Sequence, residues 1–232
     1  MQSYVTMNRI FFTADLHFGH DKIGKHMPDR PYAGDSTSLR HDKWLEKLWQ
    51  DTVDDEDTVY IVGDLTLMRK EQAQELLERL PGRKILICGN HDSTVSGLSC
   101  AFADIRQIHE INITPSKCPV LEFPIRIIMC HYPLLTWRHK AQGCIMLHGH
   151  SHGKIDGINE CSPDLRWDVG IDGSLSRAIG AVQGTGFALI ELESLYQAVL
   201  KKAGTPDIKG YLRSCYNMKE QPESYAKYAL IP

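Results

Sequence analysis

The chain has 232 residues, of which 42% are hydrophobic and 24% charged, and its formal net charge is −3. A chain of this length and composition can bury roughly 70% of the surface that it exposes when unfolded, which excludes intrinsic disorder, collagen and coiled coil. Proteins that bind long nucleic acids usually depend on a basic face, and the near-neutral net charge gives no indication of one. We therefore expect a globular domain whose partner is a small molecule.

Targeting patterns and cysteine usage favour a cytoplasmic protein without membrane contact. No apolar run approaches the roughly 18 residues of a membrane span, and the N-terminus lacks the basic and apolar stretches of a signal peptide. The seven cysteines are odd in number and show no C-x-x-C spacing. This usage is typical of reduced thiols rather than of disulfides or a cysteine zinc site.

Short apolar runs followed by polar breaks predict the strands. The runs are four to six residues long and rich in Ile, Val, Phe and Leu, as in strands that are buried on both faces. They span residues 9–14, 58–62, 84–88, 125–130, 144–147, 167–171 and 187–192. An apolar stripe predicts a helix over about residues 38–53. A second stripe at the i, i+3, i+4, i+7 spacing predicts a helix over residues 73–80 that ends before Pro81 and Gly82.

The order of these elements predicts an α/β fold. Strand, helix and strand at this spacing favour parallel pairs, whereas residues 108–130 have turn residues and no helical period, so they predict added antiparallel strands. The chain is divided into a domain of residues 1–195 and a C-terminal extension of residues 196–232, packed on the domain or lying at a contact surface. The tyrosines of this extension include Tyr211, Tyr216, Tyr225 and Tyr228.

Polar motifs follow five of the predicted strands at the point where each ends. D-x-H follows the first run, G-D the second, G-N-H-D the third, a single histidine the fourth and G-H-S-H the fifth. The carboxyl ends of strands in an α/β sheet outline a binding crevice, so these side chains should converge there. Residues i and i+2 of an extended segment point the same way, which would turn both members of each pair into the crevice. The candidate ligands are Asp15, His17, Asp64, Asn90, His131, His150 and His152.

This ligand set predicts a pair of metal ions. Carboxylate, amide and imidazole ligands suit Mn²⁺, Fe, Zn²⁺ or Ni²⁺ better than Ca²⁺. Seven ligands are too many for one catalytic ion, which needs about three, but two ions about 3.5–4 Å apart can clamp the oxygens of a phosphoryl displacement. Asp64, in a Gly-Asp turn, is the candidate bridging carboxylate. Gly63, Gly89 and Gly149 each precede a ligand and permit sharp turns near the ions.

Taken together, the motifs resemble the five signature blocks of the calcineurin-like metallophosphoesterase superfamily. The blocks are D-L-H-F-G-H from Asp15, G-D at Gly63, G-N-H-D from Gly89, His131, and G-H-S-H-G from Gly149. The segments R-P-Y from Arg30 and D-V-G-I-D from Asp168 further resemble a branch of small bacterial and phage-encoded phosphoesterases. The resemblance implies a four-layer α/β/β/α sandwich with two mixed sheets and a dinuclear centre at one edge.

The same resemblance implies a role for each ligand. Asp15, His17 and His152 would hold the first ion, Asp64 would bridge, and Asn90, His131 and His150 would hold the second. His91 would lie beside the centre without binding metal. In the expected mechanism a hydroxide that bridges the ions attacks phosphorus in line with the leaving alkoxide, while His91 donates a proton to the leaving group.

Several other residues are candidates for supporting roles. Asp92 could orient His91 or another imidazole, or cap the following turn. Substrate phosphate could be contacted by His20, Arg30 and Arg138, although a solvated charge is the simpler interpretation of the two arginines. His148 could support the ligands from behind, and Trp137 could stack on a base or fill the core. Surface or packing roles are expected for His26, His41, His109 and His139.

The leading hypothesis is a Mn²⁺-dependent phosphoesterase that acts on a small phosphodiester or nucleotide-type substrate. A diester is favoured over a monoester. Monoester sites tend to add Arg or Lys to bind the second negative charge, and no Arg near the motifs is clearly dedicated to that role. Two alternatives stay open. A nuclease would apply the same chemistry to DNA or RNA, against which the acidic balance argues. A non-catalytic interaction module on the same fold would be expected to lack ligands, whereas all seven positions are filled.

Overall fold

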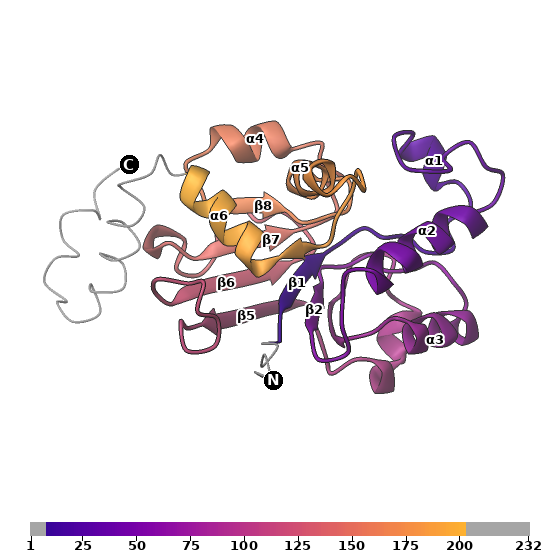
Figure 1. The fold of residues 1–232 in the computed structure, drawn as a ribbon, viewed down its shortest axis with the longest axis horizontal. Helices are drawn as coiled ribbons and strands as arrows, with labels where there is room; N and C mark the ends of the chain where they lie inside the picture. The colour runs from indigo at the N-terminus through magenta and orange to yellow at the C-terminus, as the bar shows by residue number, and fades with distance from the viewer. Residues whose placement is uncertain (1–7, 203–232) are drawn as a thin grey trace, which may run out of the picture.

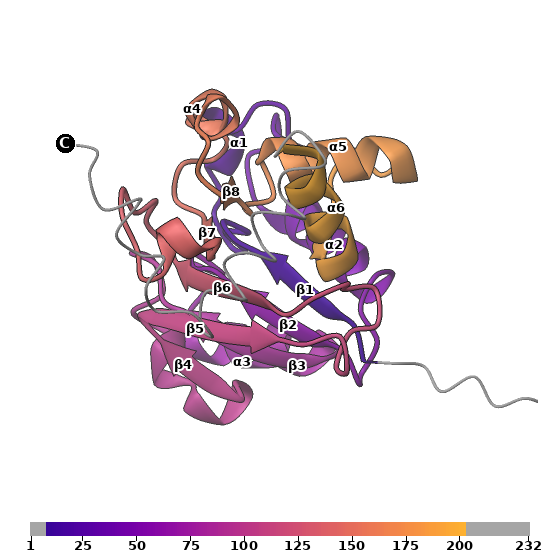
Figure 2. The same cartoon turned by 90° about the vertical axis from the view of Figure 1, so that its left-hand side faces the viewer.

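The computed structural model describes residues 8–202, which form two β-sheets packed against each other (Figures 1 and 2). The strands are β1 (Ile10–Thr13), β2 (Thr58–Ile61), β3 (Arg83–Ile87), β4 (Asp104–Arg106), β5 (Ile108–Ile113), β6 (Ile125–Cys130), β7 (Ile145–His148), β8 (Arg166–Asp168) and β9 (Ile190–Glu191). The α-helices are α1 (Ile23–His26), α2 (Leu39–Gln50), α3 (Lys70–Arg79), α4 (Asp156–Cys161), α5 (Ser174–Gln183) and α6 (Leu192–Lys202). Short 3₁₀ helices are η1 (Val95–Gly97), η2 (Ser99–Ala101) and η3 (Lys140–Gln142).

Both sheets combine parallel and antiparallel strands. The first has the order β4-β3-β2-β1-β9, in which β1 to β4 run parallel and β9 pairs antiparallel with β1. The second has the order β5-β6-β7-β8, in which β5 is antiparallel to β6 and the other pairs are parallel. The predicted α/β class with two mixed sheets is confirmed, including the antiparallel pair expected within residues 108–130.

Alternating side chains give the first sheet two apolar faces. Successive residues of a strand point to opposite sides, so Phe12 of β1 packs between the sheets with Ile127 of β6, whereas Phe11 faces the other way. On that outer side Phe11 belongs to a cluster with Trp49 of α2 and Leu76 of α3. The two predicted helices therefore form the layer that covers the first sheet (Figure 1).

The outer face of the second sheet is covered differently. Among the residues that the structure describes, the loop of residues 131–144 with η3 packs here, through Trp137 against Ile128, Cys144 and Met146. The indole N–H of Trp137 donates to the carbonyl of Cys144 at 2.9 Å. Trp137 thus fills the core, which was one of its two predicted roles. Helix α4 also packs on this face, where the buried Asn159 bonds His148 of β7 and Arg166 of β8, so the fourth layer contains a helix, as expected.

The C-terminal part of the described chain differs from the prediction. The expected strand over residues 187–192 is reduced to two residues of β9, because α6 begins at Leu192. Leu192, Leu195, Tyr196 and Val199 follow the i, i+3, i+4, i+7 spacing and are buried with residues of both sheets. The predicted boundary after residue 195 therefore falls inside a helix of the domain. Residues 203–232, with the predicted tyrosine-containing extension, lie outside the described residues.

Neither a membrane-spanning helix nor a disulfide occurs within residues 8–202. None of the helices in this range is both long and apolar enough to cross a membrane. The six cysteines in the range are all free: Cys88, Cys100, Cys118, Cys130, Cys144 and Cys161.

Candidate metal centre

The loops that carry the polar motifs meet at the edge where the two sheets join. Strands β1, β2 and β3 of the first sheet and β6 and β7 of the second lead into these loops. Ala14, just after β1, forms a parallel bridge with Gly170, just after β8. The N–H of Ile171 also donates to the carbonyl of Ala14 at 3.0 Å. This backbone junction brings the loops from the two sheets to one place.

One group of potential ligands consists of Asp15, His17 and His152. Each offers an atom to a cluster in which all ligand atoms lie within 4.8 Å of one another. The Nε2 atoms of His17 and His152 are 3.3 Å apart, and the two rings stack with centroids 5.1 Å apart. Asp15 and His17 are buried, so this group lies in the interior of the edge.

A second group shares Asp15 and adds Asp64 and His131 within the same limit of 4.8 Å. His131 Nε2 lies 3.4 Å from Asp64 Oδ2 and 3.1 Å from Asn90 Oδ1. The ring of His150 completes the set, with Nδ1 at 3.0 Å from the same Asn90 oxygen. The structure therefore brings all seven predicted ligands together.

Asp64 lies between the two groups. Its Oδ2 is 3.7 Å from His17 Nε2 on one side and 3.4 Å from His131 Nε2 on the other. This is the position that a carboxylate bridging two ions requires, although Asp15 also belongs to both groups.

The backbone turns the ligands inward in a way that the spacing did not predict. Asp15, His17, Asp64, His150 and His152 all have positive φ, between 48° and 66°. The D-x-H and H-x-H pairs were expected to lie on extended backbone, and this expectation is wrong, because left-handed residues redirect the chain at all four of their ligands and at Asp64. Such residues cost about 1–3 kcal/mol each and cluster at functional sites. The strained backbone at these five positions is therefore a further indication of a functional site.

Glycines admit two of the ligands. A Cβ on Gly89 would overlap the carboxylate of Asp64. A Cβ on Gly63, which has a φ of 90°, would overlap the ring of His131. Any side chain at these positions would displace a ligand, so the predicted glycine requirement has a steric cause.

The charge state of the buried group suits a cation. Asp15 Oδ1 accepts the backbone N–H of His150 at 3.0 Å, whereas Oδ2 is buried and has no hydrogen-bond partner among residues 8–202. Burial raises the pKa of Asp15 to about 7 and lowers that of His17 to about 3. Burial also opposes ionisation of Asp64, but its hydrogen bond and charge interaction with His131 prevail and lower its pKa to about 2. At neutral pH His17 is therefore neutral and Asp64 anionic, which are the forms that bind metal, whereas Asp15 would be fully ionised only beside a cation.

The donor set and its exposure fit a transition-metal centre. A divalent ion would satisfy the otherwise unpartnered Asp15 Oδ2, and mixed oxygen and nitrogen donors suit Mn²⁺, Fe and Zn²⁺. Asn90, His91 and His150, at the other side of the cluster, are all exposed. The cluster is therefore closed behind and open in front, as a catalytic metal site must be.

Comparison with known proteins places the chain in a family. No protein-family model matches it. It is 33% identical over 186 residues to the Gene 66 protein of Mycobacterium phage D29. This match covers 72% of this chain and 89% of the phage protein. The chain belongs to the Gene 66 protein family. An uncharacterized protein of Methanocaldococcus jannaschii is 31% identical over 150 residues, covering 64% of this chain and 72% of that protein.

The fold of this Gene 66 family member also occurs in a solved structure. A protein of unknown function from Aquifex aeolicus superposes with a TM-score of 0.58 and 22% sequence identity. The match covers 82% of this chain and 99% of that chain. This likeness supports the fold assignment alone.

Two predicted histidines of the Gene 66 family member lie beside the ligands. His91 is half-exposed, with Nε2 4.0 Å from Asp64 Oδ2, and its backbone N–H donates to Asp64 Oδ1 at 2.9 Å. The His20 ring meets that of His17 edge-on at 5.8 Å, and its buried Nδ1 has no partner among residues 8–202. The proton-donor role of His91 and the substrate contact of His20 stay predictions.

Asp92 does not have the predicted catalytic role. It is buried, and Oδ2 accepts the backbone N–H groups of Asp64 and Gly89, both at 2.7 Å. Oδ1 accepts the N–H of Leu65 at 2.9 Å. Both oxygens are thus occupied by the loops after β2 and β3, and neither orients an imidazole. Asp92 is a positioning residue that fastens these two loops to each other.

The predicted substrate contact of Arg30 is wrong because its guanidinium is buried and saturated. Nε and Nη2 donate to Asp172 at 2.9 and 2.6 Å. Nη1 donates to the carbonyl of Leu16 at 2.9 Å and Nη2 to that of Asp15 at 2.5 Å. The fifth N–H, on Nη1, faces His41 Nε2 at 3.3 Å. No donor is left for a phosphate.

His148 and Arg138 stand apart from the ligand cluster. His148 is buried, with Nδ1 2.8 Å from the carbonyl of Gly149 and Nε2 3.1 Å from Asn159 Nδ2. Burial lowers its pKa to about 4, and both of its nitrogens are used within the fold, so it does not support a ligand as predicted. Arg138 is exposed and lies 3.5 Å from Glu110, so its substrate contact stays a prediction.

Sequence reasoning missed one residue of the site. Asp172 Oδ2 accepts the Nδ1 proton of His152 at 2.7 Å, which orients the ring of a ligand. Asp172, the last residue of D-V-G-I-D, comes directly after the predicted strand of residues 167–171, as the ligand motifs follow theirs. That position was the available signal.

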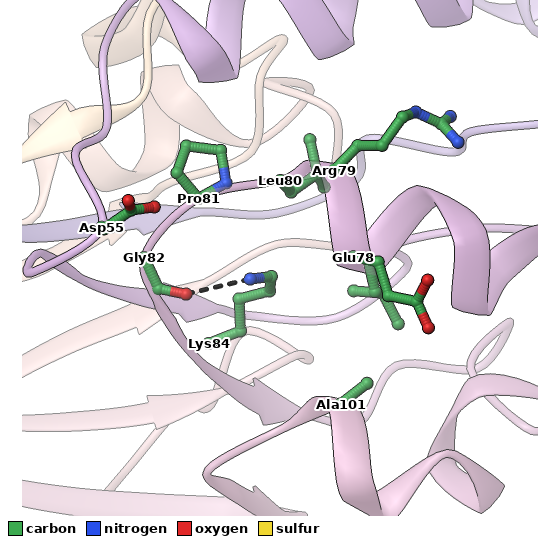
Figure 3. Close-up of a pocket in the computed structure, with 9 residues that line it drawn as sticks. Asp55, Glu78, Arg79, Leu80, Pro81, Gly82, Lys84 and Ala101 are labelled. Carbon is green, nitrogen blue, oxygen red and sulfur yellow. Dashed lines mark hydrogen bonds between the residues drawn. The ribbon is translucent and has the colours of Figure 1, made fainter.

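A separate hollow of about 410 Å³ lies at the other end of β3 (Figure 3). The turn at Pro81 and Gly82 borders it, and Lys84 points into it. Lys84 Nζ donates to the carbonyl of Gly82 at 2.9 Å, and Arg79 is paired with Glu46. Its two cations are already engaged, so we assign the hollow no chemistry.

Proposed function

We propose that the protein is a metal-dependent phosphoesterase of the calcineurin-like superfamily that hydrolyses a small phosphodiester or nucleotide-type substrate. The observation that carries the proposal is the pair of Asp/His groups that share Asp15, whose buried Oδ2 lacks a partner among the described residues. Two divalent ions would be held here, with Mn²⁺ the first candidate and Fe, Zn²⁺ and Ni²⁺ the others.

The chain's residues divide the work of such a reaction. Asp15, His17 and His152 would hold one ion, Asn90, His131 and His150 the other, and Asp64 both. Bound ions of this kind lower the pKa of water and neutralise charge on phosphate oxygens. His91 stands on the open side, and its backbone is tied to Asp64, so its ring would donate a proton to the leaving-group oxygen.

A small substrate suits the charge of the molecule. The net charge of −3 offers no long-range attraction to a polyanion, so binding of DNA or RNA would have to depend on the ions alone. Substrate would reach the centre from the side on which His91 and His150 are exposed.

The test is a hydrolysis panel with the metal-stripped protein and added Mn²⁺, Zn²⁺ or Mg²⁺. Substrates are bis(p-nitrophenyl) phosphate, p-nitrophenyl phosphate, cyclic nucleotides, dinucleoside polyphosphates, and single- and double-stranded nucleic acid. We expect metal-dependent turnover of a diester, and its loss in Asp64→Asn. No turnover of any substrate with any metal refutes the proposal, and cleavage confined to nucleic acid replaces it by a nuclease.

Asp57→Asn is the matched control for this panel. Asp57 is an equally buried aspartate in the turn before β2, at the opposite end of the sheet, where it pairs with Arg9 at 2.6 Å. Its variant should retain the activity that Asp64→Asn loses. Equal activity in the two variants would show that the turnover does not come from this site.

A further inference from the structure

The saturated guanidinium of Arg30 contacts the chain at the first ligand group. Arg30 lies in the loop after α1, and its side chain has no exposed surface. Two of its hydrogen bonds go to the carbonyls of Asp15 and Leu16, the residues on either side of one peptide bond in the D-x-H motif. Asp15 and His17 on this segment both have positive φ, so Arg30 holds the strained turn from its carbonyl side.

The third ligand of the group is reached through Asp172. The carboxylate of Asp172 forms a bidentate pair with Arg30 and accepts from His152 Nδ1 at 2.7 Å. Because an ionised carboxylate only accepts hydrogen bonds, Nδ1 of His152 carries a proton, and in the neutral ring Nε2 is the nitrogen with the lone pair. That Nε2 faces His17 Nε2 at 3.3 Å, inside the group.

We propose that the buried Arg30–Asp172 pair is a positioning device for the first ion, which fixes the Asp15–His17 turn and the ring orientation of His152 together. One guanidinium thereby reaches all three members of the group. The loops that carry Asp64 and Asn90 have a separate support, because Asp92 accepts the backbone N–H groups of Asp64 and Gly89. The second group shares only Asp15 with the first, so loss of the Arg30–Asp172 pair should weaken the first ion more than the second. This inference rests on the proposed function, since it requires two ions.

The geometry explains why other residues would not replace the pair. A lysine at position 30 carries one nitrogen, which cannot make a two-pronged contact with Asp172 and reach the carbonyls of Asp15 and Leu16 at the same time. An asparagine at position 172 keeps the shape but turns one acceptor into a donor, which would face either Arg30 or His152.

The experiment measures Mn²⁺ binding to the metal-stripped protein by isothermal titration calorimetry and equilibrium dialysis. The variants are Arg30→Met, Arg30→Lys and Asp172→Asn. In the wild type we expect two bound ions. In each variant one ion should bind about 10–100-fold more weakly, the usual effect of losing a residue that supports a ligand, and the affinity of the other ion should fall far less.

Arg9→Met is the matched control. Arg9 also pairs with a buried aspartate, Asp57. This pair lies at the amino end of β1, away from the ligands. Its loss should lower the thermal unfolding temperature and leave both affinities unchanged. A pair that serves stability alone would make the Arg30 variants behave like Arg9→Met.

The outcomes separate the inference from the function on which it rests. Unchanged affinity for both ions in Asp172→Asn, or equal weakening of both, overturns the inference while two ions in the wild type uphold the function. No bound ion in the wild type refutes the proposed function itself. If Arg30→Met does not fold, as judged by circular dichroism, the shape-preserving Asp172→Asn variant decides the question alone.

Discussion

Replacing Asp15 by asparagine separates the energetic cost of this buried carboxylate from its use as a ligand. Asp15 is fully buried, and Oδ2 has no partner among residues 8–202, so its ionisation in the metal-free protein is unfavourable. Its pKa is raised to about 7 from the ordinary value of 3.8. At about 1.4 kcal/mol per pH unit, this difference amounts to roughly 4 kcal/mol when the carboxyl is ionised in both states.

The sign of the effect follows from which state holds the proton. Below pH 3.8 the carboxyl is protonated in the folded and the unfolded chain, and nothing is lost. Between about pH 4 and 7 the unfolded chain releases the proton while the folded chain retains it, so the wild type loses stability as the pH rises. Above about pH 7 the full penalty is present. An asparagine does not titrate and escapes this loss.

Asparagine also suits the position, since it tolerates the positive φ of 56° and its oxygen can accept the His150 N–H. Its amide N–H₂ would be buried without an acceptor, at a cost of about 1–3 kcal/mol. The expected net result in Asp15→Asn is a gain of about 1–3 kcal/mol in the free energy of unfolding at pH 8, and none at pH 4.

The assay is urea unfolding of both proteins from pH 4 to 8 with EDTA present. Asp57→Asn is the control, because hydrogen bonds from Arg9 and the backbone overcome the effect of burial and lower the pKa of Asp57. That variant should lose stability at pH 8. A wild type at least as stable as Asp15→Asn at pH 8 without metal would refute the argument. Added Mn²⁺ should stabilise the wild type more than the variant.

Three further changes test other parts of the centre. His91→Ala should retain both ions yet lose most turnover, and a collapse in metal content would instead make His91 a ligand. Asp92→Asn turns an amide toward backbone N–H groups and should lower the free energy of unfolding by about 2–3 kcal/mol in urea, whereas an unchanged midpoint would contradict the role given to Asp92. Gly89→Ala should weaken metal binding about tenfold or more, as measured by dialysis, because its Cβ would displace the Asp64 carboxylate. An affinity equal to that of the wild type would show that the surrounding structure can shift to accommodate the Cβ.

Much of the fold follows from local apolar patterns. The buried strands and the apolar stripes of α2 and α3 can each be recognised from a pattern of about ten residues. The ends of the predicted strands then give the positions of the ligands. Helix α6 has the same kind of stripe, at Leu192, Leu195, Tyr196 and Val199. Its first residue, however, lies in the apolar run 187–192 that predicts a strand, and only two residues of that run form β9. Adjoining elements of different period are hard to divide by pattern alone.

The parts of the site that escaped prediction depend on the folded backbone. The positive φ values at Asp15 and His17 are imposed by tertiary contacts, and both residues otherwise favour the right-handed or extended regions. Arg30 and Asp172 form a pair although they are 142 residues apart in sequence, and a local pattern cannot predict such a contact. The side chain of Arg30 could therefore be identified as charged, but not as buried.

The burial of Arg30 bears on the substrate. Protein cations at a phosphate site usually serve the second negative charge of a monoester. Arg30 was a candidate for such a contact, but all its donors are used by Asp172, His41 and two carbonyls. Arg138 is exposed and faces Glu110. Attraction for phosphate would then come mainly from the two ions, which is enough for the single charge of a diester. On the proposed function, the hydrolysis panel should accordingly favour bis(p-nitrophenyl) phosphate over p-nitrophenyl phosphate.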